Sequence, residues 1–247
     1  MVFFQGIETV KEIITSSLCP DVLLIQEHWL TPSNLSLFSE NISTHYAFGV
    51  SAMADRVTRG PLVGRPYGGV SILINNELRT VTECVFCTER FVVIRVGTVV
   101  IINVYLPCSG TTERMSILED VLQDAWSWRL KYPDCSVIIG GDFNTDLDKC
   151  NDASSYINKF ACSNSLVRCD AKFPDKRRHT YVNESLGHSS VIDYFICDVG
   201  DSILDYSVLD PEINLSDHLP VIIRCKCVYP DFSYTAESAR VPKVKQL

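Results

Sequence analysis

Apolar residues recur along this chain in short runs that predict many strands and a few helices. Runs rich in β-branched residues, bounded by glycine or polar residues, are typical of strands. Such runs lie at 21–26, 69–74, 91–96, 99–105, 136–140, 191–197, 203–209 and 219–228. Gly97-Thr98 separates two of these runs, so we expect a hairpin turn there. The pattern therefore predicts a chain dominated by strands.

Three segments instead have the spacing of a helix with one apolar face. Near the N-terminus, Ile7 and Ile14 lie two helical turns apart. The strongest pattern covers 112–130, where Thr112 is a suitable cap, and a third covers 152–162. Strands interrupted by a few helices predict an α/β (α+β) fold with two sheets packed face to face and helices outside.

Length and composition indicate one large domain. The chain has 247 residues, of which 46% are hydrophobic and 21% charged, so it can bury a sizeable core. We expect the domain to cover 1–229 and a polar tail or linker to begin at 230 and run to 247. No apolar run is long enough to cross a bilayer, and the first residues do not resemble a secretory signal. We therefore expect an intracellular protein, nuclear or cytoplasmic, without a membrane partner.

The net charge of −8 argues against a passive nucleic-acid-binding module, which would normally be basic. An enzyme that acts on a polyanion stays compatible with this charge, because acids gathered around a metal ion count toward the total. Basic residues cluster at 172–179, including Arg177 and Arg178, and around a Gly-rich loop at 56–69. Phosphate steering and ordinary solvated charge are equally good interpretations of either cluster.

Chemically competent side chains lie at one end or the other of several of the predicted strands. They are Glu27, Tyr105, Asp142, Asn144, Asp193, Ser216, Asp217 and His218. Glu27 is suited to hold a hard cation such as Mg²⁺, although a single carboxylate at a strand end is often only a surface charge. Tyr105 can donate to a phosphate oxygen, although such a tyrosine is more often a packed aromatic. Together these side chains are typical of a site at which water attacks a phosphate ester.

Asp142 and Asn144 lie two residues apart after the apolar run, so both can face one phosphate. Asp142 could accept a proton from the attacking water, and Asn144 could donate to a phosphate oxygen. The alternative is an Asp/Asn-rich turn without catalytic work. His218 needs a carboxylate to orient it, and Asp193 is the best candidate; the alternative is a core histidine. Asp217 points differently from His218 and could assist a metal.

These motifs together resemble the endonuclease/exonuclease/phosphatase superfamily, with the DNase I-like fold, over about residues 7–228. The segments 27–30 (EHWL) and 64–70 (GRPYGGV) resemble the endonuclease domains of non-LTR, LINE-type retrotransposons. Thr180, thirteen residues before Asp193, matches the same group. The resemblance implies a four-layer sandwich of two mostly antiparallel sheets. It also implies an enzyme that nicks one strand of duplex DNA, leaving a 3′-hydroxyl that primes reverse transcription and a 5′-phosphate.

The resemblance also implies roles for individual residues. Glu27 and Asp217 would lie at a Mg²⁺ site, with Mn²⁺ as a substitute. Asp142 and Asn144 would surround the water and the phosphate, and Asp193 would orient His218. Substrate phosphates would contact Tyr105, Thr180, Ser216, Arg177 and Arg178. A reverse transcriptase domain or an element ribonucleoprotein would be the partner of a monomeric domain.

One departure concerns the start of the chain. The family's first strand ends in an Asn followed by a short turn, and matching Gln5-Gly6-Ile7 to that turn places Phe3 at the Asn position. The first strand is then truncated, as in a shortened reading frame, a decayed element copy or a host-adopted descendant. Two alternatives therefore stand beside the nicking enzyme. One is another phosphoesterase of this fold, acting on abasic DNA, an RNA tail or a phospholipid, and the other is an impaired remnant kept for binding.

Overall fold

The computed structural model describes residues 2–16, 18–60, 68–212, 214 and 216–226, with side chains described from Ile7 onward. The expected tail at 230–247 and the segment 64–67 of the Gly-rich loop lie outside these residues. Among the described residues, no helix is long and apolar enough to cross a membrane.

The larger sheet has six strands in the order β4-β5-β6-β7-β11-β8. Their bounds are β4 Thr82–Cys87, β5 Phe91–Val96, β6 Val99–Tyr105, β7 Ser136–Asp142, β11 Asp193–Cys197 and β8 Val167–Arg168. All neighbours are antiparallel except β6 and β7, which are parallel. A parallel pair needs a crossover, and the helix α4 (Arg114–Arg129) provides it.

Two smaller sheets face this one. The first has the order β1-β3-β2, formed by β1 Val22–Gln26, β3 Val70–Asn75 and β2 His45–Val50. The second pairs β12 (Ile203–Val208) with β13 (Val221–Cys225). Ile72 and Ile74 of β3 belong to the same buried cluster as Ile94 of β5 and Ile138 of β7, so the apolar inner faces form the central core.

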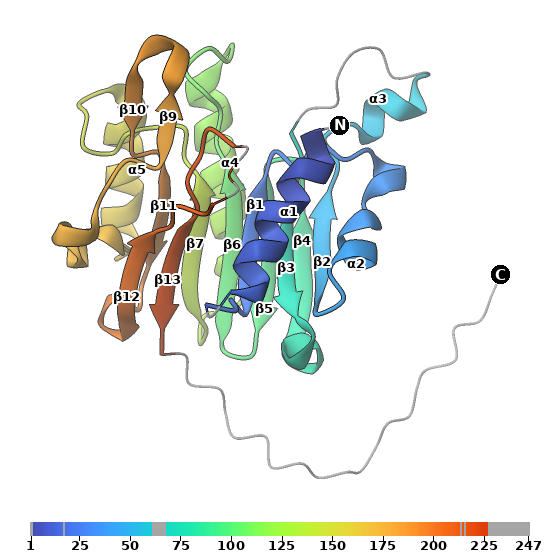
Figure 1. Ribbon diagram of the computed structural model, residues 1–247. Helices are drawn as coiled ribbons and strands as arrows, with labels where there is room; N and C mark the ends of the chain where they lie inside the picture. Colours follow the sequence, from blue (N-terminus) through green and yellow to red (C-terminus); the bar gives the residue numbers. More distant parts are fainter. Residues whose placement is uncertain (1, 17, 61–67, 213, 215, 227–247) are drawn as a thin grey trace, which may run out of the picture.

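Helices cover both outer faces, which gives the layered arrangement seen in Figure 1. The helices α1 (Val2–Thr15) and α2 (Leu37–Asn41) pack on the small sheet through a cluster that includes Ile7, Phe38 and Leu73. On the other side, α4 and α5 (Asp152–Ser163) pack on the large sheet. The remaining elements are α3 Ala54–Thr58, β9 Tyr181–Asn183, β10 His188–Ser190 and the 3-10 turns Pro32–Asn34, Asn76–Val81, Asp170–Lys172, Pro174–Lys176, Glu184–Leu186 and Gly200–Ser202.

The predicted fold class is confirmed, as a mixed α/β protein of packed, mostly antiparallel sheets flanked by helices. The sequence pattern missed β2 (HYAFGV) and β4 (TECVFC), which mix polar and apolar residues and so lack a clear apolar run. It also placed the cap of α4 at Thr112, whereas Glu113 precedes the helix with a left-handed backbone.

The expected turn at Gln5-Gly6-Ile7 is wrong, because these residues lie within α1. The helix forms there because Ile7 and Ile14, two turns apart, bury the same face against the small sheet. Phe3 lies in this helix, and its side chain is outside the described part of the structure. Within the described residues, no strand precedes β1.

His28 fixes the loop that follows β1. The ring is 6% exposed; its Nδ1 accepts from the Leu30 N–H at 3.0 Å, and Nε2 lies 3.2 Å from the Val50 carbonyl oxygen. The ring therefore carries its hydrogen on Nε2. Gly69 is required beside it, because a Cβ there would lie 2.3 Å from the imidazole. Burial lowers the pKa of His28 to about 4.

We expect His28 to make folding stability depend on pH between about 6.5, its unfolded pKa, and about 4, its folded value. In this window the unfolded chain binds a proton that the folded chain does not, so stability falls as the pH falls, by at most roughly 3 kcal/mol. Urea unfolding of the protein and of His28→Gln at several pH values measures the difference. A parallel loss of stability in both proteins over this window would contradict the assignment.

Candidate active site

Three candidate side chains form one row across the large sheet. In the strand register, Tyr105 of β6 is opposite Asp142 of β7, and Asp193 of β11 is opposite Asp142 on the other side. Because β6 and β7 are parallel while β11 is antiparallel to β7, the row combines two strand ends with one strand start. Backbone pairing alone therefore brings together residues 37 and 51 positions apart in the sequence.

Asp142 and Asn144 form a tight turn directly after β7. The Asn144 N–H donates to Asp142 Oδ1 at 2.7 Å, and its amide Nδ2 donates to Asp142 Oδ2 at 2.8 Å and to the Leu106 carbonyl at 2.9 Å. Asn144 has φ +47°, in the left-handed region that Asn tolerates better than most residues. The turn expected as the alternative is therefore present, and it fixes the carboxylate of Asp142.

The glycines before Asp142 have a packing role that the sequence did not reveal. A Cβ on Gly141, which has φ +137°, would lie 2.0 Å from the Val104 carbonyl oxygen. Gly141 thus allows β7 to lie against β6.

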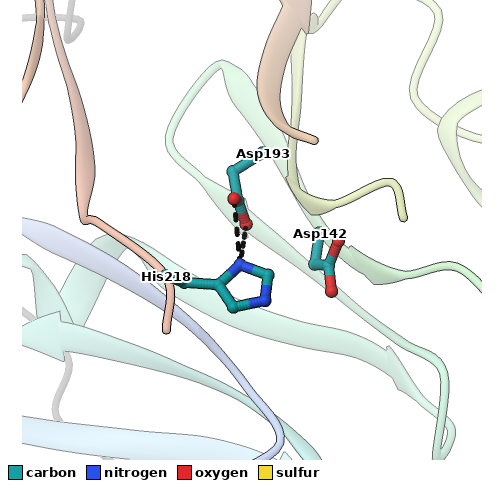
Figure 2. Close-up of side chains that lie close together, drawn as sticks. All are labelled: Asp142, Asp193 and His218. Carbon is teal, nitrogen blue, oxygen red and sulfur yellow. Dashed lines mark hydrogen bonds and ion pairs between the residues drawn. The ribbon is translucent and has the colours of Figure 1, made fainter. Parts of the chain in front are cut away.

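His218 is held against Asp193. Its Nδ1 lies 3.0 Å from Asp193 Oδ2 and 3.1 Å from Oδ1, and Figure 2 shows Nε2 on the side of Asp142. The Ser216 hydroxyl accepts from the His218 N–H at 3.1 Å. Thr180 is fully buried, and its hydroxyl accepts from the Asp193 N–H at 3.1 Å. The contact between His218 and Asp193 is the one that the sequence predicted.

Glu27 is directed toward the same end of the sheet from β1. It has φ +51°, and its Oε1 accepts from the Tyr105 hydroxyl at 2.5 Å. Burial and the neighbouring Glu27 raise the pKa of Tyr105 well above its usual range, so the phenol stays protonated and donates. Glu27 is exposed and Tyr105 is half-buried, so their contact lies at the rim of the site.

Asp142 and His218 both have raised pKa values. Burial first, and then the charge of Asp193, raise the pKa of Asp142 to about 8. Burial lowers the pKa of His218, but the hydrogen bond to Asp193 and the nearby charges of Asp193, Asp142 and Asp217 outweigh it and raise the value to about 9. Without a cation, Asp142 therefore holds a proton and His218 carries a positive charge at neutral pH.

The donor set fits a divalent cation. Ligand atoms of Asp142, Asp193 and His218 all lie within 4.8 Å of one another. Asp193 already holds the histidine, so the carboxylates of Asp142 and Glu27 are the remaining acidic oxygen donors at this end of the sheet, the type that hard cations prefer. Each of them accepts hydrogen bonds and keeps lone pairs for a cation. The raised pKa of Asp142 agrees with this fit, because a cation would take the place of the proton.

The remaining predicted residues lie farther from this centre. Asp217 is exposed next to His218. Arg177 is paired with Asp148 and Asp170, and Arg178 lies 3.8 Å from Asp210 with 40% of its side chain exposed. The two arginines thus lie outside the cluster. Thr180 and Ser216 contact it through the backbone N–H groups of Asp193 and His218. The cluster itself consists of Glu27, Tyr105, Asp142, Asn144, Asp193 and His218.

Two positioning residues were missed by sequence reasoning. Asn103 is fully buried in β6, and its amide donates to the carbonyls of Ile25 at 3.0 Å and Ser71 at 2.9 Å and accepts from Gln26. It thereby ties the large sheet to β1 beside Glu27. A lone polar residue inside the apolar run 99–105 was the available signal.

Arg114 supports the other side of the site. Its guanidinium donates to the carbonyls of Pro107 at 3.1 Å and Asn144 at 2.8 Å, and to the Thr145 hydroxyl at 2.7 Å. It therefore joins the loops after β6 and β7. The signal was a cation in the first turn of a helix, where the helix dipole disfavours positive charge.

Acids, a carboxylate-bound histidine and a tyrosine at the ends of neighbouring strands are typical of enzymes that cleave phosphate esters with water. The chain belongs to the endonuclease/exonuclease/phosphatase family, which it matches over residues 5–218. Among curated proteins, no match was found.

Solved structures share the fold at low identity. The 3′ phosphatase NExo from Neisseria, bound to a product DNA hairpin, has a TM-score of 0.68 at 14% identity, covering 90% of this chain and 94% of that chain. The APE2 catalytic domain from Xenopus laevis has a TM-score of 0.65 at 21% identity, covering 91% and 88%. The endonuclease domain of TRAS1, a telomere-specific non-LTR retrotransposon, has 0.59 at 15% identity, covering 90% and 91%. The DNase I-like fold expected from the sequence is confirmed.

We expect Asp193→Asn to lower the pKa of His218 from its raised value of about 9. The variant removes the carboxylate that raises the pKa and leaves the burial that lowers it. A pH titration of the imidazole signals by NMR measures this, with Asp217→Asn as a control that should produce a smaller change. An unchanged His218 titration in Asp193→Asn would contradict the pairing.

Proposed function

We propose that this chain is a Mg²⁺-dependent phosphodiesterase, specifically a DNA-nicking endonuclease of LINE-type retrotransposon origin. The observation that carries the proposal is the row Tyr105–Asp142–Asp193 with His218 bound to Asp193. The nick leaves a 3′-hydroxyl and a 5′-phosphate. The motif EHWL at 27–30 and the shared fold with the TRAS1 endonuclease domain support the LINE-type assignment.

In this mechanism the histidine and Asp142 act on opposite sides of the phosphate. Asp193 orients His218, whose pKa of about 9 makes it a cation at neutral pH, so Nε2 donates to a phosphate oxygen and stabilises its developing charge. Asp142, in its ionised form, accepts the proton of the attacking water. Asn144 acts on Asp142 as a positioning residue, and Thr180 acts in the same way on Asp193.

Glu27 and Asp142 would hold the Mg²⁺, and Asp217 would lie beside it. The cation would supply charge stabilisation at the phosphate oxygens, and Mn²⁺ would substitute for it. Tyr105 keeps the Glu27 carboxylate in place through its 2.5 Å hydrogen bond, so its part in phosphate binding is indirect in this arrangement.

Duplex DNA is the proposed substrate. NExo was solved with a product DNA hairpin, which favours a nucleic acid for this fold without identifying the substrate of this chain. Of the two predicted arginines, Arg178 is better placed for a phosphate because it is more exposed and only loosely paired. The proposed setting is a monomeric domain in the nucleus or cytoplasm, acting with a reverse transcriptase domain or an element ribonucleoprotein.

A supercoiled-plasmid assay tests the reaction. We expect Mg²⁺-dependent conversion to open circle, abolished by EDTA and lowered at least about 100-fold in Asp142→Asn and in His218→Ala, because each variant removes a group that acts in the transition state. Asp120→Asn, an exposed acid on α4, is the matched control and should nick normally.

The same proteins distinguish the alternatives. Normal nicking by both site variants would refute the role assignments. If the wild type is folded but cuts no plasmid, the endonuclease proposal fails. Cleavage of an abasic-site duplex, an RNA tail or a phosphoinositide would then identify another phosphoesterase of this fold, and inactivity on all of them would favour a binding remnant.

We expect Arg178 to contribute to DNA binding through its positive charge. We expect Arg178→Ala to weaken DNA binding in fluorescence anisotropy and to reduce the slope of log affinity against log salt by about 0.9, the loss of one phosphate contact. Lys131→Ala is the control and should leave the slope unchanged, because Lys131 follows the end of α4 and its ammonium lies over the Trp128 ring. An unchanged slope in Arg178→Ala would remove this residue from the DNA interface.

A further inference from the structure

Two cysteines lie side by side on an edge strand of the large sheet. Cys84 and Cys87 belong to β4, and their Sγ atoms are 3.4 Å apart. In the described part of the chain, β4 pairs only with β5, so it forms one edge of the sheet. Cys84 is exposed and Cys87 is half-buried. Dissolved small molecules can therefore reach this pair of thiols.

A β-bulge brings the two thiols together. On a regular strand, side chains three residues apart point to opposite faces of the sheet. Between Cys84 and Cys87 the ladder shifts, so that three steps along β4 match two steps along β5. The extra residue turns both cysteines toward the same face. The spacing of the two cysteines in the sequence did not predict this contact, because the contact depends on the bulge.

The two thiols of β4 differ in acidity. The hydrogen bond from the Cys87 thiol lowers the pKa of Cys84. The same hydrogen bond, and then burial, raise the pKa of Cys87. A thiol of lowered pKa that is also exposed is the one that reacts as a thiolate. Cys84 is therefore suited to attack a dissolved disulfide, with Cys87 as the second thiol.

A second thiol pair has almost the same separation but no access to solvent. The Sγ atoms of Cys169 and Cys197 are 3.5 Å apart, and the two residues are 1% and 0% exposed. Because thiol–disulfide exchange requires contact between the attacking sulfur and its target, burial protects these thiols. The buried pair is an internal control for the exposed one.

A zinc site is a weaker interpretation of the exposed pair. Structural zinc needs four ligands, usually all from the protein. Among the described residues, the one group of three or more possible metal ligands is that of Asp142, Asp193 and His218. The two thiols of β4 thus lack a third protein donor beside them.

We propose that Cys84 and Cys87 are a redox modification site, at which a low-molecular-weight disulfide such as oxidised glutathione converts the two thiols into a reversible disulfide. The Cys84 thiolate attacks one sulfur of glutathione disulfide, which forms a mixed disulfide and releases one glutathione thiolate. The Cys87 thiol then loses its proton and attacks Cys84 Sγ, which releases the second glutathione. The protein gives up two electrons and two protons, and one glutathione disulfide becomes two glutathione thiols.

The site borders a loop that contacts the candidate active site. Residues 88–90 join β4 to β5, and the Arg90 carbonyl accepts from the Tyr105 N–H at 2.7 Å. Cys87 lies directly before this loop. The proposed disulfide is thus one loop away from Tyr105, and its formation does not depend on whether the chain cleaves a phosphoester.

Mass spectrometry of the full chain in glutathione buffers tests the proposal. The folded protein is equilibrated at several ratios of oxidised to reduced glutathione, quenched with acid, alkylated under denaturing conditions and digested. We expect the peptide that holds Cys84 and Cys87 to lose two hydrogens as oxidised glutathione increases, and to regain them with dithiothreitol. Cys169 and Cys197 should be recovered alkylated throughout.

Single variants test the order of attack. Cys87→Ser keeps the attacking thiol and removes the second one, so a glutathione adduct should accumulate on Cys84. Cys84→Ser should carry at least about 10-fold less adduct on Cys87, because that thiol is less acidic and less exposed. Cys162→Ser removes an exposed cysteine of α5 and is the matched control, which should form the disulfide normally.

Three results would overturn the proposal. The first is that Cys84 and Cys87 remain alkylated at every glutathione ratio in folded protein. The second is equal adduct in the two β4 variants, since the exposed thiolate would then have no special role. The third is one equivalent of zinc in the purified protein that is lost in Cys84→Ser, which would identify a metal site instead.

Discussion

The parallel pairing of β6 with β7 is the constraint on which the candidate site depends. It sets Tyr105 opposite Asp142, and the antiparallel pairing of β7 with β11 then sets Asp193 on the other side. Because side chains alternate along a strand, a slip of one residue in either ladder would turn one member of this row to the opposite face. This register requires glycine at 141, since any side chain there would collide with the backbone of β6.

The two facing layers are kept in position by polar groups inside an apolar core. Asn103 connects β6 to β1 and β3 beside Glu27, and its removal would leave the Ile25 and Ser71 carbonyls without this donor, at a cost of about 1–3 kcal/mol each. Arg114 does the same for the loops after β6 and β7. A site at strand ends needs such supports, because Asn144 lies beyond the end of β7 and His218 is paired only through a single bridge to Tyr181.

The strand ends that carry the chemistry could be predicted from sequence because each borders an apolar run. Asp142, Asp193 and His218 were recognised in this way, and the contact between Asp193 and His218 is present. The supports could not be predicted, since Asn103 and Arg114 acquire their partners only through tertiary packing. The strands β2 and β4 were missed because they mix polar and apolar residues, and the turn expected at residues 5–7 is helix because Ile7 and Ile14 pack on the small sheet.

We propose that Glu27, directly after β1, and Asp142, at the end of β7 in the facing sheet, hold a divalent cation for phosphate chemistry. Calorimetric titration with Mn²⁺ in the absence of nucleic acid tests it most directly. We expect Mn²⁺ binding to weaken at least about 10-fold in Glu27→Gln and in Asp142→Asn, since each variant removes a carboxylate ligand. Binding should be unchanged in Asp120→Asn. Mn²⁺ binding of equal affinity in all four folded proteins, or none in the wild type, would contradict it.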